Sequence, residues 1–107
     1  MNVINLIRKE AKTLKFTITD PSGNIIDASS ATCHLYIKND IEDSSSLITK
    51  QDSDFNKAEA SNGILKVTLT SDDLDRSGVF YGVLKLEFSA TNIDKDIFKI
   101  VIINNTD

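Results

Sequence analysis

An apolar residue at every second position recurs in four separate segments of this chain, residues 12–19, 31–38, 64–70 and 79–90. In the first segment Leu14, Phe16 and Ile18 alternate with lysine and threonine. Because successive side chains of a β-strand point to opposite faces, this alternation predicts half-buried strands. No stretch of helical length sustains an apolar period of about 3.6 residues. The pattern therefore predicts an all-β fold.

The segments between these strands predict turns, loops and further strands. Residues 97–103 are apolar at nearly every position, so we expect a central or covered strand there, preceded by a connection through residues 92–96. Residues 20–24 contain Pro21 and Gly23, which favour a tight turn. Residues 71–74 predict a capped helical turn. Residues 39–62 are rich in Asp, Ser and Lys, so we expect a mobile or partner-facing region with a short edge strand at 47–49.

The length of 107 residues suits a single core. Packing two sheets face to face is the simplest way to bury several half-apolar strands, so the sequence predicts an antiparallel β-sandwich of about seven strands. A small closed barrel is the alternative. We expect residues 12–107 to form this single domain. Residues 1–11 form either an extra edge strand or an N-terminal arm that pairs with a neighbouring subunit.

Composition argues against several classes of function. The formal net charge of −4 disfavours nucleic acid and anionic membranes as partners. No apolar run reaches the ~20 residues that span a bilayer, and no basic segment precedes the first apolar residues, so neither a transmembrane helix nor a signal peptide is expected. Cys33 and His34 are the single cysteine and histidine, which excludes an intramolecular disulfide and a Cys/His zinc site.

Two resemblances support the sandwich. Residues 76–82, RSGVFYG, resemble the passage that leads into strand F of immunoglobulin domains. In this passage Phe80 falls where those domains have the corner tyrosine, and Gly82 falls where they have the second disulfide cysteine. The resemblance implies an immunoglobulin-like architecture without the inter-sheet disulfide.

The second resemblance covers nearly the whole chain, which looks like the N-terminal domain of phage baseplate upper proteins. Four segments are similar in order: KTLKFTITDPSGNIID (12–27), ATCHLYIK (31–38), GILKVTLTSDDL (63–74) and the strand at 78–88. Residues 102–106, IINNT, resemble the strand that closes that domain. The resemblance implies a non-enzymatic β-sandwich module of a bacteriophage virion, made in the host cytoplasm, whose partners are other virion proteins.

We find no catalytic signature, and we expect no enzyme activity, cofactor or metal. His34 is predicted on an outward strand position without a nucleophile pattern around it, so a solvent-exposed role is expected. Cys33 alternates with Leu35 and Ile37, which predicts a buried, inert thiol. Acidic residues cluster in the loops without the spacing of an EF-hand, so solvated loops are expected in preference to a calcium site.

The candidate interaction surface consists of the apolar N-terminal segment and of aromatic or β-branched residues at outward strand positions. These residues are Val3, Ile4, Leu6, Ile7, Tyr36, Tyr81 and Val83. The leading hypothesis is a structural protein of a phage tail, baseplate or neck that forms a homo-oligomer or a hetero-assembly. The alternative is a carbohydrate-binding module, because exposed tyrosines can stack on sugar rings. A third hypothesis, an adhesin-like repeat, is disfavoured by the lack of an export signal.

Overall fold

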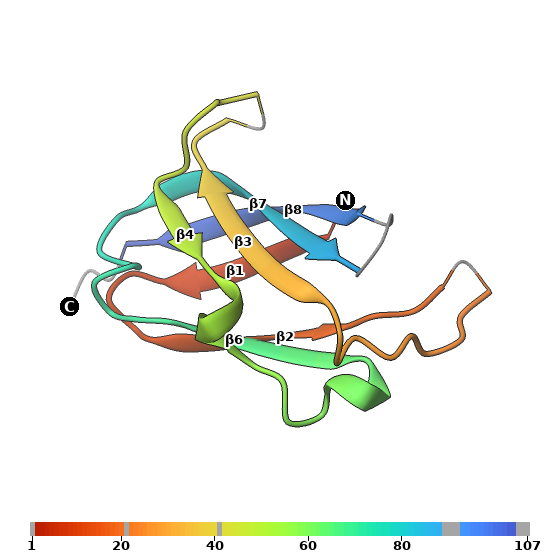
Figure 1. Cartoon of the computed structure of the whole chain (residues 1–107). Helices are drawn as coiled ribbons and strands as arrows, with labels where there is room; N and C mark the ends of the chain where they lie inside the picture. Colours follow the sequence, from red (N-terminus) through yellow and green to blue (C-terminus); the bar gives the residue numbers. More distant parts are fainter. Residues whose placement is uncertain (1, 21, 41, 89–92, 105–107) are drawn as a thin grey trace.

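The computed structural model describes residues 2–20, 22–40, 42–88 and 93–104, and the side chains of all of these except 93–96. Figure 1 shows the chain as two packed β-sheets, with a long loop between β2 and β3 that extends away from them. The elements, in chain order, are β1 Val3–Ile7, β2 Lys12–Thr17, β3 Thr32–Lys38, β4 Ile48–Lys50, the 3-10 turn η1 Asp52–Asp54, β5 Phe55–Asn56, the 3-10 turn η2 Ala60–Asn62, β6 Ile64–Leu69, β7 Gly78–Glu87 and β8 Ile93–Ile103.

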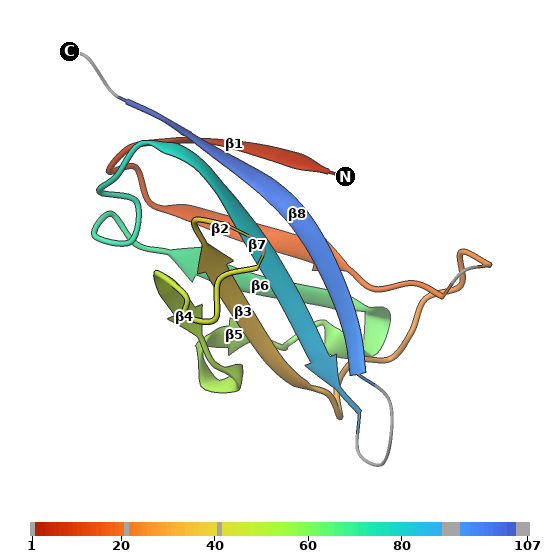
Figure 2. The ribbon, with the colours of Figure 1, turned by 90° about the horizontal axis from the view of Figure 1, so that it is seen from above.

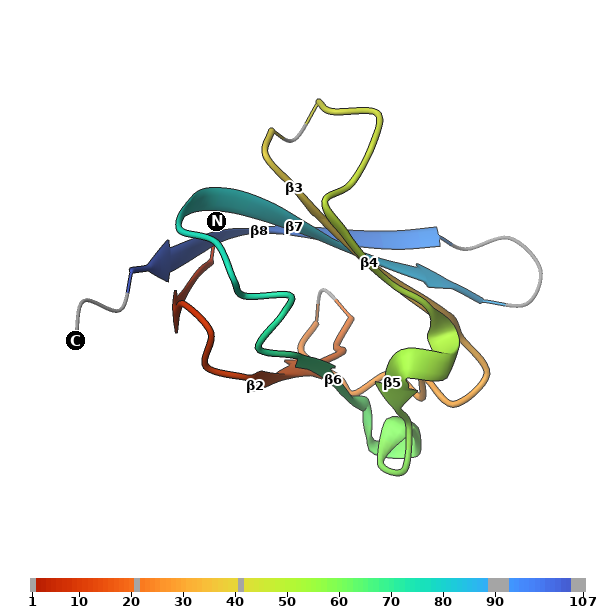
Figure 3. The ribbon, with the colours of Figure 1, turned by 90° about the vertical axis from the view of Figure 1, so that its left-hand side faces the viewer.

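The sheet topology confirms the predicted immunoglobulin-like sandwich. One sheet has five strands in the order β1-β8-β7-β3-β4, and the other has three in the order β2-β6-β5. The end-on view of Figure 3 shows these sheets as two layers. The smaller sheet has the order of immunoglobulin strands B, E and D, and β8-β7-β3-β4 has the order G, F, C and an added C′. The pairing is antiparallel except between β1 and β8, which are parallel.

Several element boundaries differ from the sequence expectation. The last strand begins at Ile93 and not at the expected Ile97. Residues 93–96, which were expected to form a connection, are part of β8 and pair with β7, while residue 92 lies outside the described part. The predicted edge strand at 47–49 is present as β4, at the margin of the larger sheet. The two-residue strand β5 was missed, because a strand that short contains no alternation.

Turn chemistry explains where strands end. One carboxylate oxygen of Asp20 accepts the N–H groups of Ser22 and Asn24, both at 2.9 Å. Gly23 lies between them at a φ of 87°, a value that glycine adopts without steric cost. Thr70 and Asp73 form a reciprocal pair of side-chain-to-backbone bonds that caps the turn after β6. Both turns were predicted, with the cap now assigned to Thr70.

The core lies between the two sheets and consists of the inward half of each strand's alternation. Among the described residues, every buried side chain is apolar. The largest fully buried side chains are Cys33, Leu35, Ile37, Leu65, Val67, Leu69, Leu74, Phe98 and Ile100. This pattern supports the predicted inner faces of β3, β6 and β7, since Phe80, Leu84 and Leu86 are also buried.

Gly82 has a specific packing role at the centre of this core. The Phe98 ring of β8 lies directly over Gly82 of β7, so that a Cβ built on Gly82 would come within 2.5 Å of Cε2 of Phe98. The ring of Phe98 also packs against Phe16 of β2, with a centroid distance of 5.6 Å. Phe16 of the smaller sheet and Phe98 of the larger sheet therefore meet beside Gly82, the position at which immunoglobulin domains have the second cysteine of their inter-sheet disulfide. An aromatic contact fills this position here.

Two ion pairs connect the sheets on the side where β4 and β5 lie. Nζ of Lys50, on β4, lies 2.7 Å from Oδ2 of Asp73, and both side chains are at most 20% exposed. The second pair lies where the chain crosses from the larger to the smaller sheet, which Figure 3 shows beside β5. There Oδ1 of Asp52 accepts the N–H of Cys33 at 2.9 Å and Nζ of Lys57 at 3.1 Å. Nζ of Lys57 also donates to the carbonyl of Ala31 at 2.7 Å.

Candidate interaction surface

Most of the exposed large apolar side chains among the described residues lie on the outer face of the five-stranded sheet. Seven large apolar side chains among the described residues are exposed, and all except Ile25 lie on this sheet or directly before β4. On strands β1, β7 and β8 buried residues alternate with exposed or half-exposed residues. The exposed and half-exposed side chains therefore point away from the core. We define the outer apolar face as Val3, Ile7, Val79, Val83, Ile97, Val101 and Ile103.

The strand register brings these residues together although they are far apart in the sequence. On the outer face Ile7 lies beside Ile103, and Val79 lies beside Val101. Further along the sheet, Ile97 lies beside Val83. Lys99 lies between Val3 and Tyr81 and is the charged residue within this set of rows. Neighbouring apolar side chains on one sheet face form a continuous patch, which is typical of protein–protein contact surfaces.

The remainder of the outer face is polar. The rings of His34 and Tyr36 stack at a centroid distance of 6.0 Å and an interplanar angle of 9°. Across the strands, Lys85 lies beside His34 and forms an ion pair of 3.0 Å with Glu87. The Lys85 ammonium lowers the pKa of Glu87, chiefly through their hydrogen bond. The outer face is therefore divided into an apolar part over β1, β8 and adjacent β7 and a polar part over β3 and the end of β7.

The predicted surface residues fall on both sides of the sheet. Tyr36, Tyr81 and Val83 are half-buried on the outer face, and Val3 and Ile7 are exposed beside them. Ile4 and Leu6 point inward: Leu6 is 3% exposed, and Ile4 packs against the core. Ile4 and Leu6 therefore do not lie on the outer face, because the same alternation that exposes Val3 and Ile7 turns them toward the core.

Val79, Ile97, Val101 and Ile103 also lie on the outer face, although they were not among the residues predicted from the sequence. The apolar character of both faces of residues 97–103 was the available signal, and it predicted a strand that is central or covered. The structure places β8 between β1 and β7, which makes it central in the sheet, but leaves Ile97 38% and Ile103 53% exposed on the outer side. A strand can be central in its sheet and still have one uncovered face.

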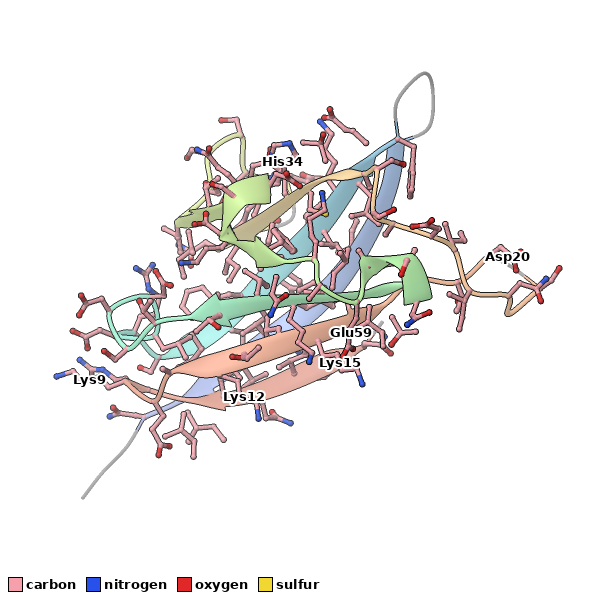
Figure 4. The ribbon with its side chains drawn as sticks, turned by 60° about the horizontal axis from the view of Figure 1, so that its bottom comes forward. Lys9, Lys12, Lys15, Asp20, His34 and Glu59 are labelled. Atoms are coloured by element: carbon pink, nitrogen blue, oxygen red, sulfur yellow. The ribbon has the colours of Figure 1, made fainter. Side chains whose placement is uncertain are left out.

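The outer side of the three-stranded sheet is chemically different. The hydroxyls of Thr13 and Thr68 hydrogen-bond across β2 and β6 at 2.9 Å. Lys15 lies directly opposite Lys66, a pairing of like charges. Figure 4 labels Lys15 on this side of β2, with His34 on the opposite side of the molecule. This side is polar, so the two sandwich faces have different chemistry.

The described residues hold neither a group of metal ligands nor a nucleophile in contact with His34. In residues 2–104, apart from the undescribed positions, no three His, Cys, Asp or Glu side chains gather as metal ligands would. No helix in the described part is long and apolar enough to cross a membrane. His34 stacks on Tyr36 and reaches no nucleophile in the described contacts.

We expect the thiol of Cys33 to be inert in the folded protein. Burial raises its pKa to about 11, and the carboxylate of Asp52 adds to this effect while the ammonium of Lys57 opposes it. Because the thiolate is the reactive form, a thiol reagent at pH 8 should modify Cys33 only after unfolding. The test compares reaction rates in buffer and in denaturant. A rate in buffer within about tenfold of the unfolded rate would contradict the structure.

Comparison with known proteins supports the fold. No protein-family model matches this chain, and no curated protein sequence matches it either. Among solved structures it is similar to the N-terminal domain of phage TP901-1 ORF48, with a TM-score of 0.64 and 11% sequence identity. The similarity covers 94% of this chain and 84% of that domain. The chain thus has the fold of a domain that occurs in a phage protein.

Proposed function

We propose that this chain is a non-enzymatic structural component of a bacteriophage virion, in the tail, baseplate or neck, and that it binds other virion proteins through its outer apolar face. The observation that carries the proposal is the similarity over 94% of the chain to a domain of a phage protein. The sequence segments that resemble baseplate upper proteins point to the same class of particle.

The chemistry of the outer face supports an assembly role. Exposed apolar side chains contributed by β1, β7 and β8 make a patch that also contains Lys99 and Asn5, and a patch of this kind gains free energy when a partner removes it from water. His34, Lys85 and Glu87 border this patch with polar groups on the side of β3 and the end of β7. Apolar contact area bordered by polar groups is common in protein–protein interfaces.

The double variant Val79→Asp/Ile103→Asp tests this function in a phage that lacks its own copy of the gene. Both side chains are about half exposed, at 46% and 53%, so the domain should still fold. Two carboxylates buried in an interface without partners should lower incorporation into particles by at least tenfold, an order-of-magnitude expectation from interface hot spots. Particle composition by mass spectrometry and plaque titre measure the effect.

The matched control is Thr17→Asp/Thr19→Asp, which adds the same charge on exposed positions of β2 and the segment that follows it. This variant should be incorporated normally. The proposal fails if the outer-face variant enters particles as well as this control, or if particles made without the protein are complete and infectious.

Carbohydrate binding is the second candidate. It is favoured by the parallel stacking of His34 on Tyr36, with Tyr81 on the same face. Rings of this kind can stack on sugars. Binding on a glycan array that disappears in the variant Tyr36→Ala/Tyr81→Ala would favour this function, and an array without signal would exclude the glycans tested.

A further inference from the structure

The free edge of β1 offers hydrogen-bonding groups that β8 does not use. The N–H of Lys99 donates to the carbonyl of Asn2, and the N–H of Arg8 donates to the carbonyl of Ile103, both at 2.9 Å. In this parallel pairing the even-numbered residues of β1 therefore direct their backbone groups toward β8. The odd-numbered residues, Val3, Asn5 and Ile7, direct theirs toward the opposite side. The carbonyl of Ile7 accepts one bond from Glu10 within the following turn.

This edge lacks the features that protect other sheet edges. Strand β1 has five residues, VINLI, without charge or proline. The edge strand β2 carries Lys12 and Lys15, whereas β4 and β5 have only three and two residues. Figure 2 shows β1 along the margin of its sheet, with its N-terminal half diverging from β2. Edges without charge, proline or shortening are the ones to which another strand adds.

The sequence of β1 is complementary to itself when reversed. If Asn5 lies opposite Asn5 of a second copy, antiparallel pairing places Val3 opposite Ile7 and Ile4 opposite Leu6. Each apolar residue then meets an apolar residue, the two amides can hydrogen-bond, and no charges within the strands face each other. A shift by one pair would bring Asn5 opposite an apolar residue. The central asparagine thereby selects a single register.

We propose that two copies of this chain associate edge to edge through antiparallel pairing of β1 with β1 about a two-fold axis at Asn5. The five-stranded sheets of both copies then form one continuous sheet, and the two outer apolar faces lie on the same side of it. Next to the edge is an open hollow of about 280 Å³ lined by Asn5, Leu6, Ile7, Glu10, Ala11 and Lys12. Ile4 of the second copy lies opposite Leu6, on the inward side, and its side chain extends into this hollow.

The proposal deepens the proposed function by naming a partner, although it rests on the geometry of β1 alone. Pairing of one short strand buries a small interface, at the low end of the size range of specific interfaces. We therefore expect a weak dimer in solution, populated at protein concentrations of about 0.1–1 mM. In a particle that holds many copies close together, the high local concentration would make the same contact persistent.

Sedimentation equilibrium of the purified chain up to 1 mM, an order-of-magnitude concentration for a weak contact, tests the proposal. The wild type should show a monomer–dimer equilibrium based on its 11.8 kDa mass. Asn5→Pro removes an N–H that points away from β8, so β1 should stay docked while dimerisation weakens by at least about tenfold, since each copy loses one donor. Asn5→Thr, which keeps the N–H, is the matched control and should retain the dimer.

A charge-swap experiment gives an independent readout. Asn5→Lys and Asn5→Glu should each dimerise more weakly than the wild type, because like charges meet at the two-fold axis. An equimolar mixture should recover a heterodimer. The proposal is overturned if the wild type is monomeric at 1 mM, an order-of-magnitude upper bound for this contact. It is also overturned if Asn5→Pro remains fully dimeric, which would indicate exchange of β1 between copies or contact through another face.

These outcomes are separable from those that test the proposed function. A monomeric chain that is nevertheless incorporated into particles refutes the edge-to-edge pairing and leaves the virion role intact. A dimer that never enters particles refutes the virion role and leaves the pairing intact.

Discussion

Gly82→Ala should lower the free energy of unfolding by about 3 kcal/mol, at the upper end of what one added methyl group costs in a tightly packed core. The new Cβ would lie 2.5 Å from Cε2 and 3.0 Å from Cε1 of Phe98, so the ring or the strand must move. The ring cannot shift freely because Phe16 of the opposite sheet contacts it. A loss of this size corresponds to a decrease in melting temperature of roughly 12–20 °C for a domain near 100 residues.

A double-mutant cycle shows whether Phe98 is the cause. Phe98→Leu alone should destabilise the domain by about 1–2 kcal/mol, because a shape change in the core leaves unfilled space. In the Gly82→Ala background the smaller side chain relieves the overlap, so Phe98→Leu should cost much less or even stabilise. Val83→Ala, on the outward side of the same strand, is the control and should change stability little. Additive effects of Gly82→Ala and Phe98→Leu would contradict the proposed contact.

Asp52→Ala should destabilise the domain by about 1–2 kcal/mol, a value that allows for the partial exposure of this carboxylate. The substitution removes the acceptor for the Cys33 N–H at the start of β3 and the anionic partner of Lys57. It thereby weakens the connection between β3 and the segment that crosses to the smaller sheet. Chemical denaturation at neutral pH measures the difference. Asp72→Ala, which removes an exposed acid of equal charge, should change stability little.

The contribution of Asp52 should also depend on pH. The backbone hydrogen bond from Cys33 lowers the pKa of Asp52 below its usual 3.8, and Lys57 adds to the effect against the opposing influence of burial. A group with a lowered folded-state pKa stabilises the protein fully above its unfolded-state pKa and loses this contribution as the pH falls through the folded-state value. The stability gap between wild type and Asp52→Ala should therefore be constant near neutral pH and narrow below about pH 4. A gap that widened on acidification would contradict this role.

The sequence predicts the strands well where each strand has one inward and one outward face. Leu35 and Ile37 on β3 and Leu65 and Val67 on β6 are buried as their alternation predicts. The turn at residues 20–24 was predictable for a local reason, because Asp20 and Gly23 supply its hydrogen bonds and its positive φ. Such features depend on residues close together in the chain, and a single sequence contains them.

Features that depend on register between distant strands could not be predicted. That Gly82 lies on an inward face follows from the alternation, but that Phe98 occupies the space above it follows only from the pairing of β7 with β8. The same applies to the outer apolar face, which assembles residues from β1, β7 and β8. The parallel addition of β1 is equally non-local. A free edge accepts a strand in either direction, so VINLI alone does not fix its orientation.

Under the proposed function a phage encodes this chain, and quantitative mass spectrometry of gradient-purified particles of that phage tests the virion role most directly. We expect the chain to co-purify with the particles at a fixed number of copies relative to the other tail proteins, and to remain after washing at high salt, because the outer apolar face makes contacts that salt does not screen. A chain that is abundant in the infected-cell lysate but absent from the purified particles would contradict the proposed function.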